Sequence, residues 1–332
     1  MKLMKSVAIL LCTLIISSNS FAKVKIGFLL STLQEERYLK DKKYFEDEAK
    51  KLGAEVIFYS ADNSERTQVK KMENLLTKGV DVVVVQPVNS DAASTLVEIA
   101  KEDDIPVIAY DRIINNADLD YYVTQDSKKV GQLQAAAAAK AINGKGNVVI
   151  LSGQSGHSVA NAITEGATEE LKKHKGINIV VQKNHDAWSP SLAMATTENA
   201  LSKYNGKIDA VLANNSGMAN GAVQAIAGFD KKLIGKVFVA GADADLASIK
   251  NIVKGSQQFE VFKDFKILAE TSARVAFNVA SKKAIGFEMT KSYNGKKDVS
   301  VINTPVFPVT KDTIQEIIIG RGFHTKNSIY GK

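Results

Sequence analysis

Short apolar runs alternate with amphipathic stretches along the whole chain. The runs consist of nearly continuous Val, Ile, Leu and Phe, without the strict alternation of a strand that has one face in water. They cover residues 24–30, 54–60, 80–86, 106–111 and 120–124 in the first half, and residues 146–152, 177–183, 208–214, 236–242 and 257–262 in the second. Strands covered on both faces have this composition, so the pattern predicts a parallel α/β sheet in each half.

Helical periodicity fills the gaps between the runs. We expect helices at about 37–52, 65–78, 91–103, 127–142, 158–174, 190–204, 217–228, 244–254 and 264–283. Strands that alternate with helices indicate right-handed βαβ crossovers. Because such sheets bind ligands beyond the carboxyl ends of their strands, two sheets predict two crevices that can face each other across a small molecule.

The order of the runs also predicts how the chain divides into lobes. The segment that joins the halves, residues 120–126, is itself strand-like and contains neither Pro nor Gly. After the run at 257–262, a long helix pattern and a further apolar run at 299–306 suit a chain that crosses back and then returns. We expect an N-terminal lobe of residues 23–125 plus about 263–302 and a C-terminal lobe of residues 126–262 plus about 303–332. Such crossings limit motion to bending and twisting about one hinge.

Residues 1–22 have the features of a secretory signal peptide. A basic start and a short apolar core are followed by a small-x-small cleavage site at residues 20–22. We expect cleavage after Ala22 and export to the periplasm. The apolar core is shorter than the roughly 20 residues that a membrane span needs. The one cysteine, Cys12, lies in this segment, so the exported chain would have no disulfide.

The formal net charge of +7 is spread along the predicted helices, in lysine pairs at 42–43, 50–51 and 70–71. Nucleic-acid binding needs a concentrated basic patch with base-stacking aromatics, so we expect a solvated basic surface and no nucleic-acid partner. The histidines lack metal-ligand spacing and the aspartates form no EF-hand loop. We therefore expect neither a metal nor a cofactor.

A set of polar and aromatic residues lies where the runs end or in the loops between them. Sugar hydroxyls both donate and accept, so carboxylates, amides and cationic side chains suit them, and the charged groups make the stronger bonds. An aromatic face can lie against the apolar C–H face of a pyranose. The set therefore predicts a site for a small sugar. Its members are Arg37, Tyr38, Asp111, Arg112, Trp188, Asn215, Asp243 and Lys263.

Each of these residues also has an ordinary structural interpretation. Asp243 can cap the helix that follows it, and Trp188 can anchor its own loop. Arg37 and Lys263 can be exposed surface residues. The shared position at strand ends favours a binding site, whereas no single residue does.

Several stretches resemble the periplasmic D-xylose-binding proteins of ABC importers. They are residues 36–38, 108–115, 207–211, 243–247 and 322–324, and the similarity extends over essentially the whole chain after residue 22. The resemblance implies a type I periplasmic binding protein fold, with two Rossmann-like lobes, parallel sheets and a hinge of three crossings. It implies aromatic walls at Tyr38 and Trp188, and a sugar held by residues matching Arg37, Asp111, Arg112, Asn215, Asp243 and Lys263.

The sequence differs from that family pattern at the sugar itself. Tyr38 stands where those proteins usually have tryptophan, and His157 and Val159 stand where they have Asp and Asn. A buried hydroxyl left without a partner costs about 1–3 kcal/mol. Either His157, Ser158 or Asn161 replaces the missing partners, or the ligand differs from xylose.

We expect a monomeric binding protein that closes on a monosaccharide and delivers it to an ABC permease. A sugar sensor that presents its ligand to a chemoreceptor or a histidine kinase would have the same sequence features. A secreted hydrolase is the third interpretation, because Ser155 follows a run within Gly-Gln-Ser-Gly-His at residues 153–157. The second glycine comes one residue too early for the G-x-S-x-G nucleophile elbow, so we expect no enzymatic activity.

Overall fold

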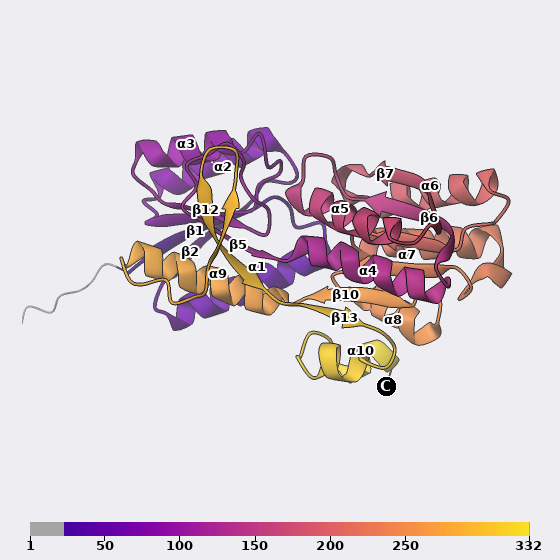
Figure 1. The fold of residues 1–332 in the computed structure, drawn as a ribbon. Helices are drawn as coiled ribbons and strands as arrows, with labels where there is room; N and C mark the ends of the chain where they lie inside the picture. The colour runs from indigo at the N-terminus through magenta and orange to yellow at the C-terminus, as the bar shows by residue number, and fades with distance from the viewer. Residues whose placement is uncertain (1–22, 332) are drawn as a thin grey trace, which may run out of the picture.

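The computed structural model describes residues 23–331, which form two α/β lobes side by side (Figure 1). The expected signal peptide, with its cleavage site and Cys12, lies outside the described residues. Within residues 23–331, every helix is too short or too polar to cross a membrane.

The N-terminal lobe contains a seven-stranded sheet in the order β11-β12-β5-β4-β3-β1-β2. Its strands are β1 (Lys25–Leu30), β2 (Glu55–Ser60), β3 (Val82–Val85), β4 (Val107–Tyr110), β5 (Tyr121–Gln125), β11 (Thr290–Tyr293) and β12 (Asp298–Thr304). Its helices are α1 (Glu36–Lys51), α2 (Glu65–Thr77), α3 (Ser94–Glu102) and α9 (Phe265–Ala280). Alternate residues of the strands enter two separate apolar cores, one under α1 and α9 and the other under α2 and α3. This explains why the strands read as continuous apolar runs.

The C-terminal lobe contains a six-stranded sheet in the order β13-β10-β9-β8-β6-β7. Its strands are β6 (Lys145–Ser152), β7 (Gly176–Asn184), β8 (Ala210–Ala213), β9 (Phe238–Ala242), β10 (Phe259–Lys263) and β13 (Val306–Val309). Its helices are α4 (Ser127–Ala141), α5 (Ser158–Lys172), α6 (Pro190–Lys203), α7 (Ser216–Phe229), α8 (Leu246–Lys254) and α10 (Lys326–Tyr330). A π-helical segment (Ile314–Ile319) and two short 3₁₀ turns (Asp186–Trp188 and Lys231–Leu233) complete the lobe.

The chain passes between the two sheets at three places. It leaves the first sheet after β5, returns from β10 into α9, and crosses again between β12 and β13. Figure 1 shows the yellow connection from β12 to β13 passing from one lobe to the other. The three passages of the chain together form one hinge, and a hinge of this kind suits a bending motion.

The sheets are mostly parallel, as the apolar runs predict, but each has one antiparallel edge strand. β11 pairs antiparallel with β12, and β13 pairs antiparallel with β10. β11 has the polar sequence Thr-Lys-Ser-Tyr and is largely exposed. An edge strand of this composition has no continuous apolar run, so the sequence did not predict β11. The apolar run at 299–306 predicted a single segment, whereas the structure has β12 and the start of β13 there.

Two glycines let α4 and α5 pack backbone to backbone. A Cβ at Gly131 would overlap the carbonyl oxygen of Ile163, and a Cβ at Gly166 would overlap that of Lys128. The alanines of α4 add little bulk between the helices. This close pair supports the start of α5, where His157 and Ser158 face the other lobe.

Candidate functional site

Arg37 lies at the centre of a buried cluster between the lobes. It is the second residue of α1, which begins just after β1, and its side chain is only 2% exposed. Its Nε lies 3.2 Å from Asp41 Oδ2, and its Nη2 lies 3.4 Å from Asp111 Oδ1. The guanidinium also stacks on Phe265, 3.9 Å from the ring centroid. Burial raises the pKa of Asp41 to about 7, although Arg37 acts in the opposite direction.

Asp111 follows β4 and has a left-handed φ of 64°. Its backbone carbonyl accepts hydrogen bonds from Tyr122 Oη and Thr124 Oγ1, which fix this unusual turn. Its Oδ2 accepts from Gln86 Nε2 at 2.9 Å. Burial opposes ionisation of Asp111, but the neighbouring cations, Arg37 first, outweigh it and lower the pKa of this carboxyl. Asp111 is therefore an ionised acceptor in the cluster.

Tyr38 supports Arg112 from behind. Its ring belongs to the apolar core with Phe28 and Phe45, and its side chain is 1% exposed. Its hydroxyl oxygen accepts from Arg112 Nη2 at 3.0 Å and from Gln86 Nε2 at 3.1 Å. The geometry does not support the expected aromatic wall at Tyr38, because the ring packs inside the lobe, where it faces the Arg37 guanidinium at 5.0 Å from the ring centroid.

His157 and Trp188 form a buried pair in the C-terminal lobe, next to Arg112. Trp188 Nε1 donates to His157 Nδ1 at 2.7 Å, which places the imidazole proton on Nε2. His157 Nε2 lies 3.4 Å from Arg112 Nη1, and both of these nitrogens are then donors. Burial and the charge of Arg112 lower the pKa of His157 to about 2, so the ring is neutral.

The indole of Trp188 is held tightly against the end of β6. A Cβ at Gly153 would lie 2.5 Å from Cζ3 and Cη2 of the indole, so only glycine fits at this position. Ala187 and Trp188 have φ values of 51° and 55°, which turn the loop back toward the lobe interface. The glycine and the turn together fix where the ring lies.

Asn215, Asp243 and Lys263 lie at carboxyl ends of the strands β8, β9 and β10. Asn215 caps α7 through its Oδ1, and its Nδ2 lies 3.5 Å from Glu35 Oε2 of the other lobe. Asp243 Oδ1 lies 2.7 Å from Lys263 Nζ and 4.0 Å from Arg37 Nη1. The N-cap position of the helix that follows is Asp245, whose side chain makes no capping hydrogen bond, so Asp243 does not cap this helix.

The buried charges form a continuous chain from one lobe to the other. Asp111 and Arg37 belong to the N-terminal lobe, and Asp243 and Lys263 belong to the C-terminal lobe. Glu35 lies beside them, and burial raises its pKa even though Arg112 acts in the opposite direction. The arrangement offers both donors and acceptors in a site largely shielded from water.

Hydrogen bonds between the lobes surround this cluster. Ile113 N donates to Ser158 Oγ, and Ser158 N donates to Ser90 Oγ. On the other side, Leu246 N donates to Glu36 Oε2 at 3.3 Å. The lobes are therefore closed on each other in this structure.

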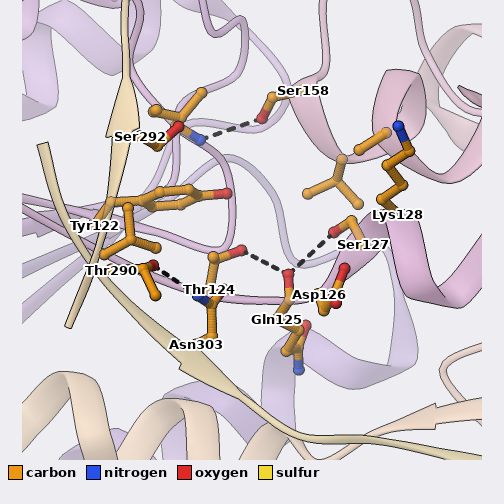
Figure 2. Close-up of a pocket in the computed structure, with 14 residues that line it drawn as sticks. Tyr122, Thr124, Gln125, Asp126, Ser127, Lys128, Ser158, Thr290, Ser292 and Asn303 are labelled. Carbon is orange, nitrogen blue, oxygen red and sulfur yellow. Dashed lines mark hydrogen bonds between the residues drawn. The ribbon is translucent and has the colours of Figure 1, made fainter. Parts of the chain in front are cut away.

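Two hollows adjoin the cluster. One of about 400 Å³ lies between the lobes and is lined by Glu35, Trp188 and Asn215, among others. The other, of about 250 Å³, lies at the hinge, where Tyr122, Ser127 and Ser158 line its wall (Figure 2). Because Tyr122 and Thr124 hold the carbonyl of Asp111, this hinge hollow lies directly behind a residue of the charged cluster.

Asn161 and Ser155 lie apart from the cluster. Asn161 is exposed on α5 and lines a surface hollow with Thr164 and Glu165. Ser155 is exposed in the turn before α5. Val159, by contrast, is buried and lines the hinge hollow. The structure therefore does not bring Asn161 into the site with the other predicted residues.

Comparison with known proteins places this chain in a family. Residues 26–284 match the family model of the periplasmic binding protein domain. The chain belongs to the periplasmic binding protein family. Figure 1 shows the two lobes and the connections that pass between them.

Relatives within the periplasmic binding protein family match nearly the whole chain. The chain is 38% identical to the D-xylose-binding periplasmic protein of Escherichia coli K12, over 98% of this chain and 99% of that protein. It is 37% identical to the D-xylose-binding periplasmic protein of Haemophilus influenzae, over 95% of each. The crystal structure of an ABC transporter solute-binding protein from Clostridium phytofermentans with bound β-D-glucose superposes with a TM-score of 0.84 at 27% identity, covering 92% of this chain and 99% of that one.

Sequence reasoning missed Gln86 and Asp41, which the structure of this protein places in the cluster. Gln86 joins Ser31, Tyr38 and Asp111 through its side-chain amide. Gln86 is the polar residue that ends the third apolar run, and the same position at the end of a run predicted the other site residues. Asp41 follows Arg37 by four residues, a spacing that places both on one face of a helix.

Proposed function

We propose that this protein is a periplasmic solute-binding protein that holds a monosaccharide, D-xylose or a closely related sugar, between its lobes. It then delivers the sugar to the membrane permease of an ABC importer. The observation that carries the proposal is the buried chain of charges from Asp111 through Arg37 and Asp243 to Lys263, which draws residues from both lobes. The names of the relatives and the glucose in the related crystal structure support the class of ligand.

The balance of charges in the cluster favours an uncharged ligand. The cationic side chains of Arg37, Arg112 and Lys263 lie among the carboxyl groups of Glu35, Asp41, Asp111 and Asp243. Burial raises the pKa of Glu35 and that of Asp41, the latter to about 7, and His157 is neutral, so the cluster has no large excess of either sign of charge. A charged ligand would leave an unmatched buried charge, which is strongly unfavourable. A neutral polyol can donate to the carboxylates and accept from the cations without changing this balance.

We assign two kinds of role within the site. Residues that contact the sugar in this proposal are Arg37, Asp111, Arg112, Trp188, Asn215, Asp243 and Lys263. Tyr38 and His157 act behind them, because Tyr38 bonds Arg112 and His157 bonds Trp188. Asn161 is left out of the site because it is exposed on α5.

Binding works by a population shift between open and closed lobes. The moving bodies are the lobes expected from the sequence, residues 23–125 with about 263–302 and residues 126–262 with about 303–332, except that Lys263, the last residue of β10, moves with the C-terminal lobe. A sugar that contacts both bodies only when they are closed stabilises the closed state by its differential affinity. The closed form then presents one composite surface to the permease, and a chemoreceptor can read the same surface.

The proposal includes export, cleavage after Ala22 and a monomeric state of the mature chain. It gives Ser155 no catalytic role. Ser155→Ala should leave sugar affinity unchanged, because the residue is exposed outside the buried cluster.

Calorimetric titration of the mature chain tests the function. We expect saturable binding of one sugar per chain with a Kd in the micromolar range or below. The panel is D-xylose, D-ribose, L-arabinose, D-glucose and xylitol. Absence of binding and of thermal stabilisation across the whole panel would overturn the proposal.

A further inference from the structure

Glu260 is a carboxylate buried inside the C-terminal lobe. It lies in β10 between the apolar residues Phe259 and Val261, and its side chain is fully buried. Its register partner on β9 is Gly241. A Cβ at that glycine would overlap Glu260 Oε1. Gly241 therefore leaves the space that the carboxylate fills.

The two oxygens of Glu260 accept hydrogen bonds from three directions. Oε1 accepts from Gln257 Nε2 at 2.6 Å. Oε2 accepts from Ser216 Oγ at 3.0 Å and from the backbone N–H of Ala244 at 3.1 Å. Because Ser216 Oγ itself accepts from the Asp245 N–H at 3.1 Å, the carboxylate holds two consecutive amides, one directly and one through a hydroxyl.

These two amides belong to a strained turn that carries a residue of the sugar site. Asp243 and Ala244 have φ values of 96° and 61°, in the left-handed region that residues other than glycine rarely adopt. Such a conformation persists only where the surroundings determine it strongly. The turn directs the Asp243 carboxylate to Lys263.

We infer that Glu260 is a positioning residue of the sugar site, which fixes the Asp243 turn and, through Ser216, the start of α7 beside Asn215. This inference rests on the proposed sugar-binding function. Glu260 acts from behind the turn, since the hydrogen bonds of its carboxylate go to the protein. Burial raises the pKa of Glu260 to about 7, and the nearby Asp243 acts in the same direction.

Two substitutions separate the acceptor from the bulk of the side chain. Glu260→Gln keeps an acceptor oxygen for Ser216 and Ala244. A flip of the Gln257 amide, whose Oε1 has no hydrogen-bond partner among residues 23–331, then lets this oxygen accept from the new NH₂ group. The flip gives up the hydrogen bond from Gln257 Nε2 to the Phe259 carbonyl, which is not part of the Asp243 turn. Glu260→Met has a similar length but no comparable acceptor, so both amides of the turn lose their support.

Amide hydrogen exchange of the sugar-free mature protein tests the positioning directly. We expect Glu260→Met to speed exchange at the Ala244 and Asp245 amides at least tenfold, and Glu260→Gln to stay within threefold of the wild type. The Ile150 amide in β6 is the internal control. Equal exchange in Glu260→Met and the wild type would overturn the inference. Because this measurement needs no sugar, its outcome is independent of the proposed function.

Affinity for the sugar that the wild type binds tests the consequence. We expect Glu260→Met to bind at least tenfold more weakly and Glu260→Gln to bind within threefold of the wild type. In an Asp243→Asn background, Glu260→Met should cost less affinity than in the wild type, because the part of its effect that acts through Asp243 is already lost. Wild-type affinity in Glu260→Met, or fully additive losses in the double variant, would contradict the positioning role.

A milder variant keeps the test decisive if Glu260→Met does not fold. Ser216→Ala removes only the hydroxyl that joins Glu260 to the Asp245 amide. We expect faster exchange at Asp245 with little change at Ala244, and a sugar affinity lowered about threefold or more. Unchanged exchange at Asp245 would overturn the inference.

Discussion

Arg37 and Asp243 lie on opposite lobes, with Arg37 Nη1 4.0 Å from Asp243 Oδ1. Both side chains are buried, and removing an ionised group from water costs several kcal/mol unless pairing offsets it. Asp111 pairs with Arg37 on one side, and Lys263 pairs with Asp243 on the other. Each lobe therefore pairs its own buried charges, and closure brings the two paired groups together at a place where a bound polyol can bond to both.

Asp243→Asn should weaken sugar binding about 10- to 100-fold. The substitution keeps the size of the side chain but removes the charge that faces Lys263, and hydrogen bonds to charged groups contribute about 1.5–3 kcal/mol. Titration calorimetry measures the change. Asp312→Asn, at an exposed aspartate of the same lobe, is the matched control and should bind like the wild type. Wild-type affinity in Asp243→Asn would remove this residue from the site.

Gly153→Ala should displace Trp188 and weaken sugar binding. The added methyl group would lie 2.5 Å from the indole, so the ring must shift, and overpacking of this kind costs about 1–3 kcal/mol. Trp188 is the only tryptophan, so its fluorescence reports the shift directly. Gly228→Ala in α7 has open space around its new methyl group and should be neutral or slightly stabilising. Identical emission spectra and stability in Gly153→Ala and the wild type would disprove the close packing.

Tyr38→Phe should destabilise the closed cluster although it removes a single oxygen atom. Arg112 Nη2 and Gln86 Nε2 both lose an acceptor, and a buried donor without a partner costs about 1–3 kcal/mol. Urea unfolding gives the loss of stability, and calorimetry should show a several-fold weaker affinity. Tyr44→Phe, at a partly buried tyrosine of the same helix, is the control. If both variants behave alike, Tyr38 has no supporting role for Arg112.

The depressed pKa of His157 predicts a specific pH dependence of stability. The unfolded chain protonates this histidine near pH 6.5, whereas the folded protein resists protonation until about pH 2. Stability from the neutral ring is therefore complete above pH 6.5 and falls as the pH drops below it, by about 2 kcal/mol between pH 7 and 5. His157→Asn has no group at this position that titrates in this range. The difference in unfolding free energy between the wild type and this variant should therefore shrink as the pH falls from 7 to 5. Parallel pH profiles would contradict the assignment of a buried neutral histidine.

The buried strands could be predicted from the sequence because both of their faces are covered. β3, Val82–Val85, is wholly buried and reads as an uninterrupted apolar run. β11 could not be predicted in this way, since its polar and largely exposed residues resemble a loop. The short α10, Lys326–Tyr330, also lacks a helical repeat long enough to be recognised.

The candidate site could be predicted in part, for a topological reason. Asp111, Asp243 and Lys263 meet because the carboxyl ends of parallel strands face one interface. The directions of side chains could not be predicted by the same rule. Asn161 lies one helical turn after His157 but faces solvent, and Tyr38, next to Arg37, turns into the core. These directions depend on how each helix packs on its sheet.

The most direct test of a two-lobe sugar trap is the distance between the lobes with and without sugar. The mature chain has no cysteine of its own after residue 22, so Lys70→Cys in α2 and Lys203→Cys in α6 accept spin labels at exposed positions of opposite lobes. Pulsed electron resonance should give a broad distribution that includes longer distances without sugar, and one narrow, short distance at saturating sugar. A distribution that is unchanged by a sugar shown to bind would contradict closure of the lobes around it.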